Sequence, residues 1–193
     1  MKNKVVLVGK GPSSREIKKS DDYDIACLNN AVILCEEVDF LFINDMEVLD
    51  LIEDEQWIKV KKVIIPTHPH YNCGPHKNIT YSTLLDKIPT KVEYDVHRLD
   101  TCLKRDPNTP YLGQSYSVGT TAIQWLGKNG CKELDYCGID PDGGYNPIFN
   151  IMGVDGQPKN HAARAEVGKA VYQGNYARFV DTATQYGITL NRL

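Results

Sequence analysis

Short apolar runs separated by polar corners recur along the chain, and they predict an α/β fold. Each run is rich in Val, Ile and Leu and stops at a Gly, Asn, Asp or Pro, as the buried strands of a parallel sheet do. Helical patterns between the runs imply right-handed crossovers, so we expect a Rossmann-like, doubly wound and mostly parallel sheet. The predicted strands cover residues 5–8, 24–28, 38–43, 63–65, 92–94, 133–140 and 188–190.

The helices are predicted from capping residues and amphipathic spacing. Residues 12–17 offer caps and a first helical turn directly after the first strand. A helix over residues 118–126 is expected to end at Gly130 in a C-cap position, and a long helix over residues 161–186 has its weak point at Gly174. Shorter helices are predicted at residues 31–35 and 46–55.

The length of 193 residues predicts a single domain, residues 1–193, because it is below the size at which chains usually divide. Residues 66–112 are rich in Pro, His, Asn, Tyr and Thr and are predicted to form an irregular insertion. The polar segment 141–160 is predicted to be a short lid loop before the last helix.

Composition and charge narrow the classes of partner. The formal net charge of −3 gives no overall positive field, so nucleic acid is not indicated as a partner. No apolar run approaches the length of a membrane span, and the first residues do not form a signal peptide. The six cysteines show neither a CxxC pair nor the spacing of a zinc site, which favours reduced thiols, no metal site and a cytoplasmic location.

Polar residues stand at the ends of the predicted strands, where an open α/β sheet binds its ligands. The carboxyl ends of parallel strands meet at one edge, so we expect these corners to form one site. They are Gly9, Lys10 and Gly11, then Asn29 and Asn30, then Asn44 and Asp45, and finally Gly138, Ile139 and Asp140.

The first corner predicts a phosphate site. Gly9 and Gly11 let the backbone approach a ligand closely, and a helix beginning after them would direct its free N–H groups and positive dipole end at that ligand. The Gly-x-Gly-Pro-Ser pattern is neither a Walker motif nor a full dinucleotide fingerprint, so a tight turn without a ligand is the alternative. No acidic residue ends the second strand to bind the ribose of NAD, which argues against a dehydrogenase.

The next two corners each allow more than one interpretation. The amides of Asn29 and Asn30 suit a nucleotide base or ribose, although asparagine at a strand end is also a common turn former. Asp45 could bind a metal, pair with a cation or cap the following helix, and capping is the favoured interpretation.

Two further groups could take part in chemistry. Ser117, Gly119, Thr120 and Thr121 place hydroxyl and N–H groups at a helix start, which predicts a second anion site or a simple N-cap. His161 follows the polar loop, with Glu166 about one turn further on. A neutral imidazole there could accept a proton from a hydroxyl, the alternative being a partly exposed histidine at a helix start.

Taken in order, these motifs resemble the sialyltransferases, both the bacterial family 42 and the animal-type family 29. The resemblance reaches the closing residues 186–191 but does not cover residues 66–112. The matching segments are residues 6–13 for the opening strand and Gly-x-Gly-Pro-Ser loop, 28–31 for the Leu-Asn-Asn-Ala of the large sialylmotif, 42–45 for the next nucleotide-contacting corner, 117–122 with 134–140 for the small sialylmotif, and His161 for the general base.

This resemblance implies a GT-A-like sialyltransferase variant of the fold and transfer from a CMP-activated, sialic-acid-like sugar to a glycan or other hydroxyl acceptor. It implies that His161 deprotonates the acceptor, that the sugar is attacked with inversion, and that neither a metal ion nor another cofactor takes part. It assigns Tyr145 a hydrogen bond to the leaving phosphate. It also implies that Gly9, Gly11, Ser13, Asn29, Asn30 and Asn44 hold the nucleotide, and Thr120 and Thr121 its phosphate or sugar.

Two departures from the family keep other functions open. The lid segment is short, and Lys10 replaces the customary Asn or Gly, which would suit a diphosphate. Archaeal hydroxymethylpterin pyrophosphokinases share the Gly-x-Gly-Pro-Ser start and a Gly-Thr-Thr-Ala helix start, and in that interpretation Asp45 and Asp140 would hold Mg²⁺ against a nucleoside triphosphate. A nucleotide-binding module without catalysis is the third hypothesis.

Overall fold

The computed structural model describes residues 1–44, 48–49, 52–66, 85–99, 111–113, 117–149 and 165–193. Eight strands form a sheet in the order β6-β5-β4-β3-β2-β1-β7-β8, and each neighbouring pair is parallel. The strand order reverses between β1 and β7, so the predicted Rossmann-like α/β class is confirmed. The strands are β1 (Lys4–Val8), β2 (Asp24–Leu28), β3 (Val38–Phe42), β4 (Val60–Pro66), β5 (Glu93–Leu99), β6 (Tyr111–Gly113), β7 (Glu133–Cys137) and β8 (Thr189–Arg192).

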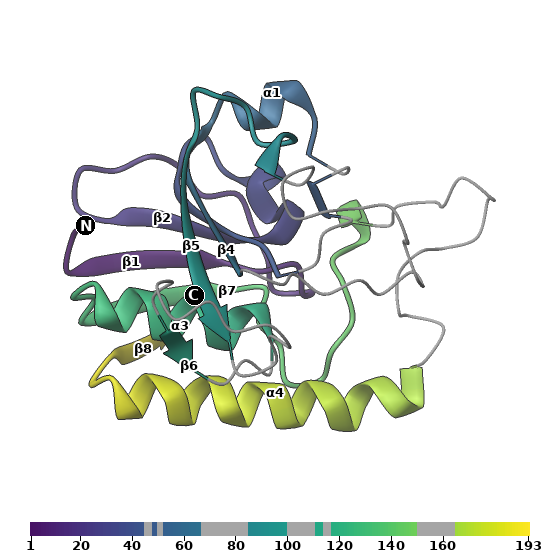
Figure 1. Cartoon of the computed structure of the whole chain (residues 1–193). Coiled ribbons are helices and arrows are strands. Elements are labelled where there is room, and N and C mark those ends of the chain that lie inside the picture. The colour runs from purple at the N-terminus through teal and green to yellow at the C-terminus, as the bar shows by residue number, and fades with distance from the viewer. Residues whose placement is uncertain (45–47, 50–51, 67–84, 100–110, 114–116, 150–164) are drawn as a thin grey trace.

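Helices cover both faces of the sheet (Figure 1). α3 (Val118–Lys128) and α4 (Ala165–Gln185) pack against each other on one face. The 3-10 helix η1 (Asn29–Leu34) and the short α1 (Asp54–Trp57) contribute to the core on the other face. A second 3-10 turn, η3 (Pro147–Phe149), belongs to the loop after β7. None of the helices in the described part of the chain is long and apolar enough to cross a bilayer.

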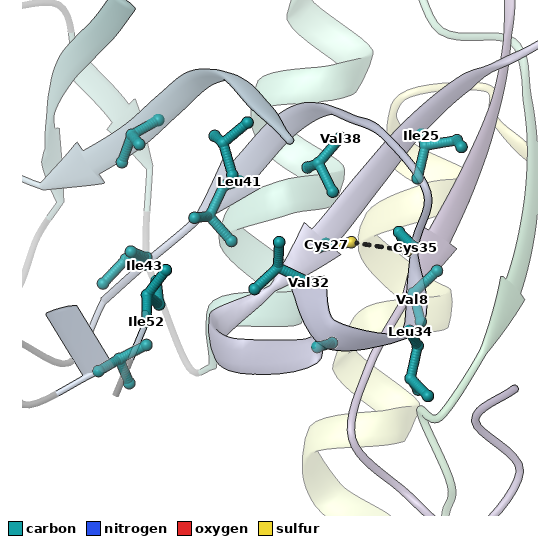
Figure 2. Close-up of a cluster of buried hydrophobic side chains, with 14 of the residues drawn as sticks. Val8, Ile25, Cys27, Val32, Leu34, Cys35, Val38, Leu41, Ile43 and Ile52 are labelled. Carbon is teal, nitrogen blue, oxygen red and sulfur yellow. Dashed lines mark hydrogen bonds between the residues drawn. The ribbon is translucent and has the colours of Figure 1, made fainter. Parts of the chain in front are cut away.

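Each face of the sheet carries its own hydrophobic core. In β1, Val5 and Leu7 pack in the cluster beneath α3 and α4, whereas Val6 and Val8 pack in the opposite cluster. Because both faces are covered, the strand is apolar at consecutive positions, which is the pattern of a buried parallel strand. Figure 2 shows the cluster of Val6 and Val8, on the face opposite α3 and α4. In it Val32 of η1 lies among side chains from several strands.

A pair of buried thiols helps to dock η1 on the sheet. The sulfur atoms of Cys27 in β2 and Cys35 after η1 lie 3.2 Å apart (Figure 2). Burial, followed by the contact with Cys35, raises the pKa of the Cys27 thiol well above its usual value. The Cys27 thiol therefore behaves as a small core residue at neutral pH.

Several strand boundaries differ from the predicted ones. β7 ends at Cys137 instead of continuing to residue 140, because Gly138 has a φ of +68° that extended strand does not use. The closing strand lies at Thr189–Arg192, slightly beyond the predicted residues 188–190. Within the predicted irregular insertion, β5 covers most of the strand predicted at residues 92–94 and is longer than expected, the start of β6 adds a further strand, and residues 85–92 form mostly turns and bends.

The helix predicted over residues 12–17 is wrong. The chain forms a turn at residues 12–13 and then an isolated bridge between Ile17 and Cys35. The Ile17 amide donates to the Leu34 carbonyl and the Glu36 amide donates to the Ile17 carbonyl. These bonds to a distant segment satisfy the backbone groups that a local helix would have used.

Two other helix predictions need correction. Within the described part of residues 46–55, only Asp54 and Glu55 are α-helical, and they belong to the short α1. α4 continues without interruption through Gly174, the position where a break was considered possible, and its first described residue is Ala165. Residues 161–164 of the predicted long helix lie outside the described residues.

Candidate functional site

The loops after β1 and β7 form the centre of the candidate site, at the point where the strand order reverses. The Gly9 amide donates to the Cys137 carbonyl and the Gly11 amide donates to the Gly138 carbonyl, both at 2.8 Å. In return, the Gly138 amide donates to Ser13 Oγ at 2.8 Å. The two loops are therefore joined by hydrogen bonds at the edge where an α/β sheet binds ligands.

This close approach explains the glycines of the corner. A Cβ atom added to Gly9 would lie 2.2 Å from the Gly138 carbonyl oxygen, and one added to Gly138 would lie 2.3 Å from the Gly9 carbonyl oxygen. A Cβ added to Gly11 would lie 2.2 Å from Asp140 Oδ2. The glycines are thus required by contact between two loops, whether or not a ligand binds.

The backbone amides assigned to phosphate are already bonded within the protein. Besides Gly9 and Gly11, the Ser13 amide donates to Asp140 Oδ2 at 3.0 Å and the Ser14 amide donates to the Gly11 carbonyl at 2.9 Å. No helix follows the turn in the structure, so the predicted dipole contribution is wrong. A phosphate beside this turn would have to bind through side chains.

Lys10 is the cation of the turn, and it faces the loop after β7. Its Nζ lies 4.7 Å from the centroid of the Tyr145 ring, a cation–π contact. The next residue, Asn146, donates its amide to the Lys10 carbonyl at 2.8 Å and its Nδ2 to the Ser14 carbonyl at 3.2 Å. The described start of the predicted lid is therefore hydrogen-bonded to the glycine turn. The hydrogen bond predicted from Tyr145 to a leaving phosphate stays a prediction.

Asn29 and Asn30 lie at the carboxyl end of β2, next to the glycine turn of β1. Both are buried, at 7% and 3% exposure, and their Oδ1 atoms have no hydrogen-bond partner among the described residues. Ser14 is also buried, at 8% exposure, and its Oγ likewise has no partner among the described residues. Buried polar atoms are nearly always paired, so unpaired acceptors grouped at a strand edge suggest a ligand that donates hydrogen bonds.

The start of α3 is tied to the end of β3. Ser117 is the N-cap, accepting the Thr120 amide through Oγ at 3.2 Å. The Thr121 hydroxyl donates to the Ser117 carbonyl and accepts from Asn44 Nδ2 at 3.0 Å. Thr120 and Thr121 have no exposed surface, and Gly119 packs near Phe179. The N-cap interpretation is confirmed, and these hydroxyls stabilise the helix rather than face an open anion site.

Asp140 is held by partners within the chain. Oδ2 accepts from the Ser13 amide, and Oδ1 accepts from Arg192 Nη2 at 2.5 Å. Ile139 is partly buried against the core beneath α4. Asp45 and His161, which the sequence singles out for metal binding and proton transfer, lie outside the described residues. Within the described ranges, no group of three or more His, Cys, Asp or Glu side chains is placed to hold a metal ion.

The sequence analysis passed over three residues with notable environments. Arg192 donates to Asp140 and Asn146 donates to the Ser14 carbonyl, across sequence separations of 52 and 132 residues. His97 in β5 is 3% exposed, and neither ring nitrogen has a partner among the described residues. Burial, followed by the Lys128 charge, lowers the pKa of His97 to about 4. No local motif marks any of these residues.

No family model, curated protein or solved structure matches the chain.

Proposed function

We propose that this protein is a sialyltransferase-like glycosyltransferase that moves a sugar from a CMP-activated donor to an acceptor hydroxyl. The observation that carries the proposal is Asn30 at the carboxyl edge of the sheet, whose buried Oδ1 has no partner within the part of the chain that the structure describes. The motif resemblance supplies the donor class and the role of His161.

Asn30 supports a nucleotide because its Oδ1 has no hydrogen-bond donor among the described residues. An unpaired buried acceptor costs about 1–3 kcal/mol, which a ligand that donates a hydrogen bond would recover. Ribose hydroxyls and the exocyclic amine of cytosine are donors of this kind, whereas phosphate oxygens at neutral pH mainly accept. Asn29 Oδ1 is a second unpaired acceptor at the end of the same strand, so this edge suits the nucleoside part of the donor.

The proposed reaction is a single displacement. The His161 imidazole accepts the proton of the acceptor hydroxyl, and the oxygen attacks the anomeric carbon of the donor. A new carbon–oxygen bond forms as the bond to phosphate breaks, and CMP leaves with the bonding electrons. Inversion follows from attack on the face opposite the leaving group.

The pyrophosphokinase alternative receives less support from the described contacts. That function would use Asp45 with Asp140 as Mg²⁺ ligands. Both oxygens of Asp140 already accept from donors, Ser13 and Arg192, and the Arg192 guanidinium already pairs with its charge, which makes it a poorer ligand for a cation. We therefore favour transfer from a nucleotide sugar.

A thermal-shift panel of CMP, CDP, UDP, GDP and ATP, each with and without Mg²⁺, tests the proposed donor. A ligand at 100 times its Kd stabilises the folded state by about 2.7 kcal/mol, which is easily measured. We expect CMP or CDP to raise Tm equally with and without the metal. A response to ATP that requires Mg²⁺ would support the pyrophosphokinase, and no response to any nucleotide would contradict nucleotide binding.

Variants separate binding from catalysis. We expect Asn30→Leu, a change of similar size, to abolish the CMP response while leaving the Tm of the free protein unchanged or higher, because no bond within the described protein is lost. Asn129→Leu, at the far end of α3, is the matched control and should keep the response. His161→Ala should keep CMP binding and lose sugar transfer; retained transfer would rule out His161 as the base.

A further inference from the structure

Asp140 connects the last strand of the sheet to the glycine turn. Its Oδ1 accepts from Arg192 Nη2 at 2.5 Å, and its Oδ2 accepts from the Ser13 backbone amide at 3.0 Å. The Asp140 side chain is only 8% exposed, whereas that of Arg192 is 47% exposed. The carboxylate is thus an almost buried charge with one cationic partner and one backbone donor.

The conformation of the turn is built around this carboxylate. Gly11 has no room for a Cβ because Asp140 Oδ2 occupies that space. The hydroxyl of Ser13 accepts from the Gly138 amide while its own amide is held by Asp140. Moving the carboxylate would therefore release Ser13 and open space beside Gly11.

The position of the carboxylate depends on Arg192. A nearly buried charge is costly unless it is paired, so loss of the guanidinium favours rotation of Asp140 towards water. We propose that Arg192 is a positioning residue that acts through Asp140 to hold Ser13 and the glycine turn in their binding conformation. The consequence for nucleotide affinity rests on the proposed function, whereas the effect on Ser13 does not.

A second ion pair on the same loop provides a matched control. Asp142 Oδ1 lies 3.4 Å from Lys169 Nζ of α4, with side-chain exposures of 76% and 59%. This pair joins the same loop to α4, and among the described residues neither side chain bonds to the glycine turn. Arg192→Gln and Asp140→Asn can therefore be compared with Lys169→Gln and Asp142→Asn, which make the same charge changes.

The direct test is hydrogen exchange of the Ser13 amide, followed by NMR in the full chain. We expect exchange to accelerate by about tenfold or more in Arg192→Gln and Asp140→Asn, as loss of a hydrogen bond to a charged group implies. Arg192→Lys should restore most of the protection, and both control variants should match the unmodified protein. In parallel, the Kd for CMP should rise in Arg192→Gln and recover in Arg192→Lys. The Tm of the free protein should fall in Arg192→Gln, because the nearly buried Asp140 loses its cationic partner, and recover in Arg192→Lys.

The possible results test the positioning role of Arg192 and the proposed nucleotide separately. Unchanged Ser13 exchange in Arg192→Gln, or equal acceleration in Lys169→Gln, would overturn the positioning role. Faster Ser13 exchange in a protein that binds no CMP even when unmodified would support the positioning role and refute the proposed nucleotide. Faster exchange together with weaker CMP binding would support both.

Discussion

Asn29 and Asn30 are adjacent asparagines that the fold uses differently. Asn29 has a φ of +55°, in the left-handed region that asparagine tolerates better than most residues, so the turn itself explains its identity. Asn30 lies within η1 without such a conformation and still buries an unpaired oxygen. At the residue scale, Asn30 is therefore the more specific indicator of a ligand.

His97 is a second residue whose environment is unusual. It lies in β5, buried, with a pKa lowered to about 4 by burial and then by the charge of Lys128 at the end of α3. Because the folded pKa is below the ordinary value of 6.5, the unfolded chain binds a proton more readily. His97 therefore makes stability fall as the pH drops from about 6.5 to about 4.

Replacing His97 tests this linkage. We expect the free energy of unfolding of His97→Phe, relative to the unmodified protein, to rise by about 1.4 kcal/mol per pH unit on acidification through that range. At pH 7 the difference should be small, because the ring nitrogens make no bonds to lose. Urea unfolding of both proteins at pH 7 and pH 4.5 measures the change; a difference independent of pH would show that His97 is not the group responsible.

At the scale of elements, the contact between the loops after β1 and β7 is the decisive feature. Gly-x-Gly-Pro-Ser predicts a turn, and a turn is present, but the helix expected after it is replaced by backbone bonds to the segment after η1. By contrast, Ser117 predicts the start of α3 correctly, since its cap bond joins residues only three positions apart. Local bonds were predictable here, and bonds between distant segments were not.

Two glycine substitutions test the importance of this contact. We expect Gly9→Ala to destabilise the protein by about 3 kcal/mol, because the new Cβ would lie 2.2 Å from a backbone oxygen that cannot move freely. We expect Gly174→Ala to stabilise it by about 0.5–1 kcal/mol, because that helical position has no atom within 4 Å of a new Cβ. Urea unfolding of both variants checks the values; equal effects would show that the loops can separate at little cost.

For the whole molecule, the sheet includes two strands from the segment that was predicted to be an irregular insertion. β5 pairs with β4 and β6 pairs with β5, so these strands belong to the same sheet as β1. The expectation of a single domain stays a prediction. It implies that the two cores, one on each face, unfold together.

Calorimetry of Phe179→Ala tests that cooperativity. Phe179 of α4 is 1% exposed and packs on Tyr136 of β7, so its truncation should cost about 3–5 kcal/mol. We expect one transition, moved to lower temperature as a whole, whereas Val171→Ala, at 55% exposure on the same helix, should change little. Separate transitions for the two faces would contradict a single cooperative domain.

The sequence by itself determined the α/β class, the positions of the central strands and the start of α3. These features depend on burial patterns and on bonds between near neighbours in the chain, so they can be predicted from short stretches of sequence. Only the tertiary structure decided that the Gly9 and Gly11 amides bond to Cys137 and Gly138, that Asp140 pairs with Ser13 and Arg192, and that residues 12–17 form no helix. The physical reason is that these contacts join residues far apart in the chain, where hydrogen bonds and steric fit outweigh weak local preferences.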